Sequence, residues 1–174
     1  MKGHTADVQF TIRDYRASDF DRLWQIDQLC FPAGIAYTQM ELMGFIIRRK
    51  AITLVGEVAD VKADVRNGRA ADIPSNGSWI GGFVVAVRLR AQVGHVVTLD
   101  IVPEARRSGL ASRLMSECER RLRAAGCTQV YLETAVTNEP ALRLYRKLGY
   151  EIVRTLPEYY SGQALDAFQM AKRL

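Results

Sequence analysis

The sequence predicts an α/β (α+β) fold with about seven strands and about four helices. The first observation behind this prediction is the alternation of segments rich in β-branched residues with segments of helical apolar period, in the order β-α-α-β-β-β-α-β-α-β-β. The second observation is size and composition. The 174 residues, 48% apolar and 25% charged, fit one globular core, so we expect a single domain over residues 1–174.

The first strand is expected within "VQFTIRDY", and two short helices follow it. Ser18 and Asp21 have the spacing of a capping box that opens the first of these helices. The apolar side chains that helical period turns toward the core are Phe20, Leu23, Trp24, Ile26 and Leu29. "CFPAGIAY" interrupts this helix, and Thr38 with Glu41 repeats the capping spacing at the second. The second helix has an apolar side formed by Leu42, Phe45 and Ile46.

"ITLVGEVA" and "SWIGGFVVAVRL" are rich in β-branched residues and predict the second and third strands. The segment between them, residues 60–78, is polar, contains glycine and is broken by proline, which predicts a long loop. Three roles stay open for this loop: a gate over a groove, a contact with a partner, or an inert insertion. "AQVGHVVTLDIV" predicts the fourth strand, which stops at Pro103.

A long amphipathic helix is expected over residues 105–125. Its apolar stripe consists of Leu110, Leu114, Cys118 and Leu122, and Gly126 ends it. "TQVYLETAV" predicts a strand, and "NEPALRLYRKLG" predicts a helix that Asn138 opens and Gly149 ends. "YEIVRTL" and "ALDAFQMAKRL" predict the last two strands.

Composition limits the classes of partner and location. No run approaches the roughly 20 apolar residues of a membrane span, and the first residues lack a signal-peptide core, so we expect a cytoplasmic protein without a membrane partner. The three cysteines lack metal-ligand spacing and are expected to be reduced packing residues. The net charge of +5 is scattered, which makes nucleic acid an unlikely partner and leaves a small phosphate-bearing ligand sufficient.

The two histidines do not indicate a catalytic triad or a metal site. His4 lies in the terminal segment, and His95 begins a strand, where a structural role is expected. No cysteine nucleophile is indicated either, which disfavours a covalent enzyme intermediate.

"PEARRSGLASRLM" places arginines, a serine and a glycine in front of the long helix. Solvated surface is one explanation for this pattern. The other is a phosphate socket, because the unpaired N–H groups and positive dipole end of a helix start attract anions and Gly109 lets the ligand approach the backbone.

The order of elements and two motifs resemble the Gcn5-related N-acetyltransferase (GNAT) family, and the resemblance covers almost the entire chain. In the first motif, Arg106, Gly109 and Ala111 match the family signature (Arg or Gln)-x-x-Gly-x-(Gly or Ala). In the second, "VYLETAVTNEPALRLYRKLGYE", Asn138 and Tyr145 have the family spacing. The resemblance implies the GNAT fold, a mixed central sheet that splays between its fourth and fifth strands and accepts the pantetheine arm of acetyl-coenzyme A (acetyl-CoA) there.

The resemblance also implies which residues bind the acetyl-CoA. The helix start would hold its pyrophosphate, and the main chain of the fourth strand would hold its arm. These residues are Leu99, Asp100, Ile101, Arg106, Arg107, Ser108, Gly109, Leu110, Ala111, Asn138 and Tyr145. Arg107 could instead be solvated, Ser108 could only cap, and Asn138 could cap its helix while touching the cofactor.

Two residues fit the chemistry of acetyl transfer to an amine. By strand alternation Glu133 points away from Val130 and Leu132, so it could take a proton from the amine directly or through water. The resemblance places Tyr145 near the cofactor sulfur as general acid. The competing interpretations are a solvated or ion-paired glutamate and a core tyrosine.

The segments "LCFPAGIAYT" and "LPEYYSGQALDAFQMAKRL" resemble the branch that includes the bacterial ribosomal-protein alanine N-acetyltransferase and archaeal N-terminal acetyltransferases. The resemblance implies a peptide groove walled by Phe31, Tyr37, Tyr159 and Tyr160. Ala135 departs from that branch, whose members usually have a polar residue there. We therefore expect acetyl transfer to a protein N-terminus in a ternary complex. Transfer to a lysine or a small amine, a non-catalytic acetyl-CoA sensor, and the oligomeric state stay open.

Overall fold

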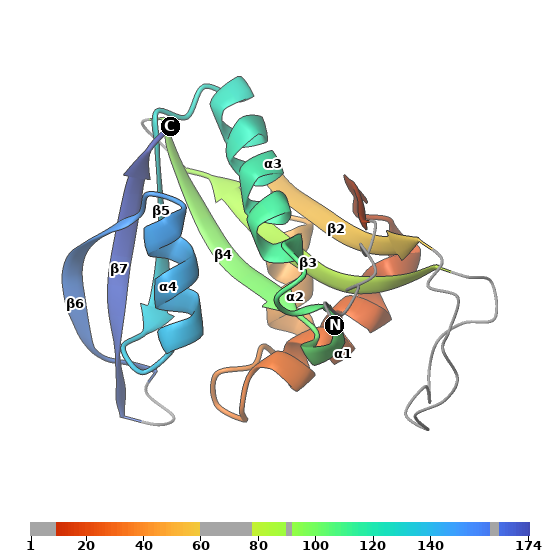
Figure 1. Ribbon diagram of the computed structural model, residues 1–174, viewed down its shortest axis with the longest axis horizontal. Helices are drawn as coiled ribbons and strands as arrows, with labels where there is room; N and C mark the ends of the chain where they lie inside the picture. Colours follow the sequence, from red (N-terminus) through yellow and green to blue (C-terminus); the bar gives the residue numbers. More distant parts are fainter. Residues whose placement is uncertain (1–9, 60–77, 90–91, 161–163) are drawn as a thin grey trace, which may run out of the picture.

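The computed structural model describes residues 10–59, 78–89, 92–160 and 164–174, and these form one seven-stranded sheet in the order β1-β2-β3-β4-β5-β7-β6. The strands are β1 Phe10–Asp14, β2 Ala51–Ala59, β3 Ser78–Arg88, β4 Val93–Ile101, β5 Gln129–Ala135, β6 Glu151–Tyr160 and β7 Leu165–Arg173. The α-helices are α1 Phe20–Cys30, α2 Gln39–Ile46, α3 Leu110–Ala124 and α4 Glu139–Lys147. The predicted fold class and order of elements are confirmed (Figure 1).

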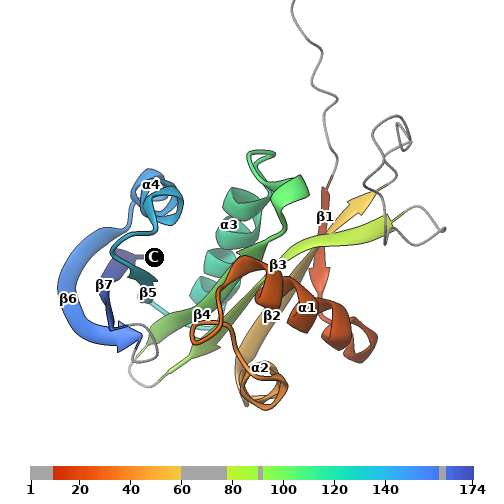
Figure 2. The ribbon, with the colours of Figure 1, turned by 90° about the horizontal axis from the view of Figure 1, so that it is seen from below.

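The helices cover both faces of the sheet. Seen from below, α3 and α4 lie on one side and α1 and α2 on the other (Figure 2). The core consists of residues from both layers, with the α3 side chains of Leu110, Leu114, Cys118 and Leu122 all buried as the predicted stripe requires. The sheet therefore separates a layer with α3 and α4 from a layer with α1 and α2.

The strands β4 and β5 are the one parallel pair of the sheet, and they pair over a short length. Val93–Val96 pairs with Gln129–Leu132, and beyond Val96 the two strands diverge (Figure 1). All other neighbouring strands are antiparallel. The predicted splay between the fourth and fifth strands is confirmed. We call the diverging part of β4 and β5 the fork.

The start of α1 differs from the prediction. Ser18 lies in a 3₁₀ turn, Ala17–Asp19, and the box is closed by Asp19, whose Oδ2 accepts the Arg16 N–H at 2.7 Å. The same carboxylate accepts two hydrogen bonds from Arg13 of β1, at 2.7 and 3.0 Å. This contact with the neighbouring strand, which local spacing does not reveal, selects Asp19 over Ser18 and Asp21.

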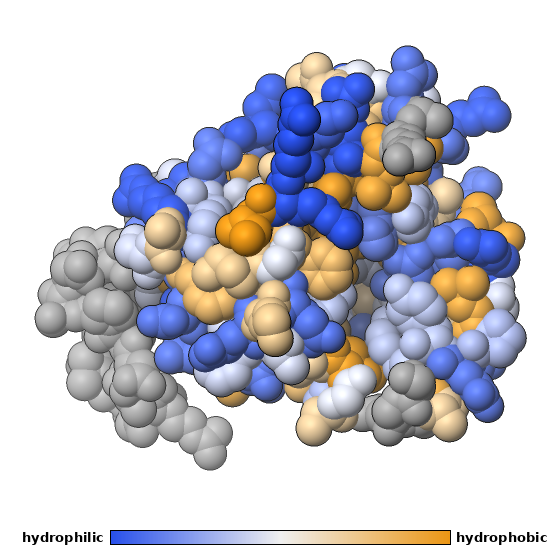
Figure 3. Space-filling view, turned by 180° about the vertical axis from the view of Figure 1, so that it is seen from behind, coloured by the Kyte–Doolittle hydropathy of each residue, from blue (hydrophilic) through white to orange (hydrophobic). Residues whose placement is uncertain are grey.

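The inward face of α1 is also narrower than predicted. Leu23 and Ile26 are fully buried, but Leu29 is 63% exposed. Helical period shows which residues share a side of a helix, but not how far the sheet extends beneath it. Exposed apolar side chains form separate orange patches among charged ones on the face that carries α1 and α2 (Figure 3).

The other helix boundaries largely follow the sequence. The Thr38–Glu41 capping box is confirmed, with the Glu41 N–H donating to Thr38 Oγ1 and the Thr38 N–H to Glu41 Oε2. The long helix begins at Leu110, later than predicted, because a 3₁₀ turn at Pro103–Ala105 and a short loop precede it. Gly126 has φ of 87° and ends α3 as expected.

Other findings concern the described residues only. No helix among them is long and apolar enough to cross a membrane. Cytoplasmic location stays a prediction. The three cysteines are free, and the described residues contain no cluster of histidine, cysteine and carboxylate side chains suited to a metal ion. His4 and residues 60–77 of the predicted loop lie outside the described residues.

Candidate active site

Along β4, the main-chain N–H and C=O groups of every second residue face the fork. The Val102 N–H donates to the Gly81 carbonyl on β3 at 3.0 Å, and this bond shows which residues of β3 and β4 form hydrogen-bonded pairs and which do not. With Gly82 opposite Ile101, the main-chain groups of Leu99 and Ile101 face away from β3 and toward the fork. The predicted main-chain contacts of Leu99 and Ile101 are therefore compatible with the structure.

The main-chain N–H and C=O groups of Asp100 face its partner Phe83 on β3, and the Asp100 side chain is fully buried. Thr98 Oγ1 donates to Asp100 Oδ1 at 2.5 Å, whereas Oδ2 has no hydrogen-bond partner among the described residues. Burial raises the pKa of the Asp100 carboxyl well above its ordinary value. Cofactor binding by Asp100 stays a prediction, and its main-chain groups face β3 and not the fork.

The loop before α3 leaves open space at the position where the sequence predicts an anion socket. Arg107 and Gly109 have positive φ values of 61° and 90°, and the chain then enters α3 at Leu110. No described atom lies within 4 Å of the position that a Gly109 Cβ would occupy, so the space in front of the helix start is open. The first N–H groups of a helix have no partner within it, and they point toward this space.

The side chains of this loop divide into two groups. Arg106 and Arg107 are exposed, and Arg106 Nε donates to the Ile101 carbonyl at 3.1 Å, which ties the loop to the end of β4. Ser108 Oγ donates to the Ala105 carbonyl and accepts the Leu110 N–H at 3.4 Å, so it acts locally as a cap. The Leu110 side chain is buried, that of Ala111 is half-buried, and the Leu110 N–H already meets Ser108 Oγ, which leaves the Ala111 N–H as the group suited to an anion.

Glu133 lies on β5, next to the point where pairing with β4 ends. Its Oε2 is 2.7 Å from His95 Nε2, and its Oε1 accepts a hydrogen bond from Gln169 Nε2 at 2.8 Å. Burial raises the pKa of the Glu133 carboxyl, but the hydrogen bonds from His95 and Gln169 outweigh burial, and the pKa lies below its ordinary value. Glu133 is therefore an ionised, hydrogen-bonded carboxylate at neutral pH.

His95 is the functional candidate that sequence reasoning missed. It was expected to be structural, yet the structure stacks its ring on Tyr131 at 4.4 Å between centroids and joins it to Glu133. The parallel register, with His95 opposite Tyr131, brings Glu133 within reach. The signal available in the sequence was that both residues lie on the strands that form the fork, but alternation within one strand does not define the register between two.

Tyr145 lies on the buried face of α4. Burial, followed by the charges of Asp100 and Tyr160, raises the pKa of its phenol, so the hydroxyl keeps its proton at neutral pH. These two neighbours belong to β4 and β6, which places Tyr145 beside the fork. Asn138 caps α4, accepting the Ala141 N–H at 3.3 Å, and its predicted contact with the cofactor stays a prediction.

The three tyrosines of the predicted aromatic wall lie near one another and come from two segments of the chain. Tyr159 and Tyr160, at the end of β6, meet edge to face at 5.1 Å. Burial, then Tyr159 and Glu133, raises the pKa of Tyr160 to about 12, and burial, then Tyr159 and Tyr160, raises the pKa of Tyr37. Tyr159 and Tyr160 thus lie within electrostatic reach of both Tyr37 and Glu133. Phe31 is half-buried at the end of α1, in the turn that leads to Tyr37.

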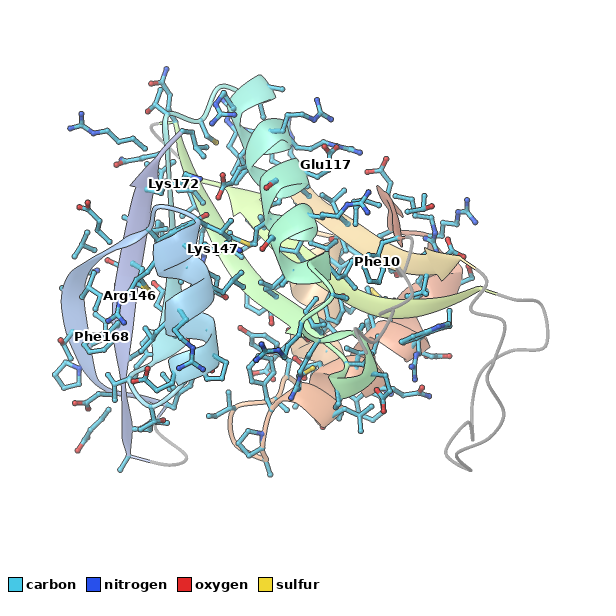
Figure 4. The ribbon with its side chains drawn as sticks, in the orientation of Figure 1. Phe10, Glu117, Arg146, Lys147, Phe168 and Lys172 are labelled. Carbon is cyan, nitrogen blue, oxygen red and sulfur yellow. The ribbon has the colours of Figure 1, made fainter. Side chains whose placement is uncertain are left out.

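A hollow of about 650 Å³ lies elsewhere, between β1 and α3, and Phe10 and Glu117 mark its two walls (Figure 4). None of the predicted site residues lines it. Lys172 of β7 binds Glu119 of α3 at 2.6 Å, which joins the two parts of the sheet on the α3 side. The groups with chemistry for acyl transfer therefore concentrate at the fork, and the hollow is separate from them.

Comparisons with known proteins agree with the observed fold. The family model described as "Acetyltransferase (GNAT) family" matches residues 12–150. An N-alpha-acetyltransferase of Saccharolobus solfataricus is 32% identical over 168 residues, which are 95% of this chain and 93% of that protein. The crystal structure of Ard1 from Thermoplasma volcanium has a TM-score of 0.76 at 24% identity, over 96% of this chain and 99% of that one. Arabidopsis thaliana NAA60 in complex with acetyl-CoA has a TM-score of 0.73 at 23% identity, over 95% and 99%.

Proposed function

The chain belongs to the acetyltransferase (GNAT) family, and on that basis we propose that it transfers the acetyl group of acetyl-CoA to the α-amino group of a protein N-terminus. The observation that carries the proposal is the Glu133–His95 pair, which lies at the fork within electrostatic reach of Tyr159 and Tyr160. An acid–base pair beside an aromatic wall suits an extended peptide that presents a primary amine. The 32% identical relative, named as an N-alpha-acetyltransferase, supports the same acceptor.

The proposed binding of acetyl-CoA uses two parts of the backbone. The N–H groups at the start of α3, with Gly109 at φ of 90°, would hold the pyrophosphate, and Arg106 and Arg107 would add positive charge. The main chain of Leu99 and Ile101 would pair with the amide groups of the pantetheine arm. The open space at Gly109 and the diverging strands both fit such a ligand.

The proposed proton path begins at His95. Because an ionised carboxylate only accepts hydrogen bonds, Nε2 of His95 donates to Glu133, and in the neutral ring Nδ1 is then an acceptor. The His95 side chain is 23% exposed and that of Glu133 is 10% exposed, so His95 is the more accessible to an amine. We therefore assign proton removal from the ammonium to the pair, with Glu133 orienting His95 through their hydrogen bond.

The transfer step itself is direct. The neutral amine nitrogen forms a bond to the acetyl carbonyl carbon, the carbon–sulfur bond breaks, and Tyr145 donates its proton to the leaving thiolate. The new amide nitrogen releases its second proton to water, and Tyr145 regains its proton from water. The raised pKa of Tyr145 keeps that proton in place until the thiolate forms.

The Glu133→Gln variant should lower kcat about tenfold or more, since loss of the carboxylate that orients His95 removes part of the roughly 10²- to 10⁴-fold contribution of general base catalysis. The wild-type rate should fall as pH drops through the Glu133 pKa, which lies below its ordinary value of 4.5, because protonation removes the carboxylate. In the variant the part of the acidic limb that protonation of Glu133 causes should be absent. The measurement is the pH profile of kcat/KM on one peptide, since the substrate's own ammonium also titrates.

Glu151→Gln is the matched control, because Glu151 is an exposed glutamate at the start of β6. The Glu151→Gln variant should have the kcat and the pH profile of kcat/KM of the wild type. Full activity of Glu133→Gln with an unaltered acidic limb would return Glu133 to the role of a polar strand residue.

The acceptor is tested by mass spectrometry of amines incubated with the protein and acetyl-CoA. The panel pairs each peptide with a copy blocked at its N-terminus, includes internal lysines, and adds polyamines and amino sugars. We expect a gain of one acetyl group at free N-termini and none on blocked copies. Acetylation of blocked peptides would identify lysine as the acceptor, and labelling of small amines alone would exclude a peptide substrate. Binding of acetyl-CoA without any transfer would indicate a sensor.

A further inference from the structure

We propose that Asp27 of α1 is a positioning residue for the amine substrate, which acts by holding the segment that carries Tyr37 against the fork. The proposal rests on the proposed function, because it treats Tyr37 as part of the acceptor groove. It adds a residue that sequence reasoning did not select.

The first observation is that α1 binds both polar groups of the Tyr37 main chain. Asp27 is fully buried, and its Oδ2 accepts the Tyr37 N–H at 2.8 Å. Gln28 Nε2 and Trp24 Nε1 donate to the Tyr37 carbonyl at 2.8 and 3.2 Å. Gln28 Nε2 also donates to Asp27 Oδ2 at 3.0 Å. These three α1 side chains, Trp24, Asp27 and Gln28, form what we call the Tyr37 clamp.

The second observation is where the clamp places the Tyr37 ring. The hydroxyl donates to the Val97 carbonyl of β4 at 3.5 Å, and the ring packs edge-on against Phe45 of α2 at 5.2 Å. Val97 is the first residue of β4 beyond its pairing with β5. The ring therefore lies at the opening of the fork, and its position depends on a main chain that the clamp holds at both its N–H and its carbonyl.

The third observation is that burial of the Asp27 carboxyl destabilises the folded state, so packing alone does not explain this residue. Its Oδ1 has no hydrogen-bond partner among the described residues, and burial raises the pKa of the carboxyl to about 6. Asp100, whose own carboxyl has an unpartnered buried Oδ2, feels the charge of Asp27 from β4. A buried carboxylate with an unpartnered oxygen destabilises a fold, so its presence beside Tyr37 favours a positioning role.

The test compares two substitutions at Asp27. Leucine removes the acceptor for the Tyr37 N–H, whereas asparagine keeps an acceptor oxygen of the same reach. Loss of the hydrogen-bond partner of one buried donor corresponds to a change of roughly 5- to 150-fold in an equilibrium constant. Asp27→Leu should therefore raise the KM of the amine substrate about tenfold or more, with a smaller change in kcat and no change in the Kd of acetyl-CoA. Asp27→Asn should restore KM to within about threefold of wild type.

Gln28→Met provides a second variant in case Asp27→Leu does not fold. Gln28 is exposed, so its loss removes two hydrogen bonds of the clamp with little effect on the core. Gln25→Met, an exposed glutamine of the same helix, is the matched control. We expect a raised KM for Gln28→Met and a wild-type KM for Gln25→Met. Equal KM values for these two variants would overturn the proposal, as would a folded Asp27→Leu variant with unchanged KM.

Failure of the proposed function would be recognised separately. Trp24 and Trp79 are the two tryptophans of the chain, so a Trp79→Phe background leaves Trp24 as the single emitter inside the clamp. Release of Tyr37 in Asp27→Leu should shift Trp24 emission whether or not a peptide is the substrate. A clear emission shift without any peptide acetylation would reject the proposed acceptor and retain the clamp, whereas unchanged emission and KM would reject the clamp.

Discussion

Tyr145→Phe is expected to lower kcat by about 10²-fold or more while the affinity for acetyl-CoA changes little. The substitution removes one hydroxyl and keeps the ring, which lies buried in the core against Tyr150 with 5.8 Å between centroids. Because burial and the charges of Asp100 and Tyr160 raise the pKa of Tyr145, the hydroxyl is protonated at neutral pH and is a donor. A proton donor to the thiolate acts on the transition state, so its loss appears in kcat.

The measurement is single-turnover acetylation of a peptide identified in the mass-spectrometry panel, with the Kd of acetyl-CoA measured in parallel. Tyr150→Phe is the matched control, since it removes a hydroxyl from a neighbouring buried tyrosine that the proton path does not use. The control should be as fast as wild type. If Tyr145→Phe is equally fast when chemistry limits the rate, Tyr145 is a packing residue and the thiolate takes its proton from another source.

Gly109→Asp is expected to abolish the thermal stabilisation that acetyl-CoA provides to the wild-type protein. A ligand that binds only the folded state adds about 2.7 kcal/mol of stability at 100 times its Kd. The new carboxylate would stand at the start of α3, in the open space proposed for the pyrophosphate, and would repel it. The measurement is the Tm of wild type and variant with and without saturating acetyl-CoA.

Two controls separate repulsion from backbone strain. Gly126→Asp introduces the same side chain at the same φ region, 87°, but at the opposite end of α3, so it should keep the full ligand-induced shift. Gly109→Asn adds similar volume without charge and should keep part of it. A folded Gly109→Asp variant that acetyl-CoA stabilises as much as wild type would show that this loop does not bind the pyrophosphate.

Local patterns accounted for most of the elements. The Thr38–Glu41 box, the stripe from Leu110 to Leu122 and the glycine at the end of α3 depend on residues three or four positions apart, and they are confirmed. The predicted start of α1 was wrong because Arg13 of β1 binds Asp19. The predicted burial of Leu29 was wrong because the residues of a helix do not show how far the sheet extends beneath it.

The sequence by itself determined the family and the fold class, because both depend on motifs and an order of elements that can be read along the chain, whereas the anion socket before α3 stays a prediction. Tertiary structure alone decided the partners of the chemical groups. His95 meets Glu133 through the register of two parallel strands, and Asp27 meets Tyr37 through the path of the chain between α1 and α2. Side-chain hydrogen bonds require donor and acceptor within about 3 Å, and the separation of residues 38 or 10 positions apart depends on how whole elements pack.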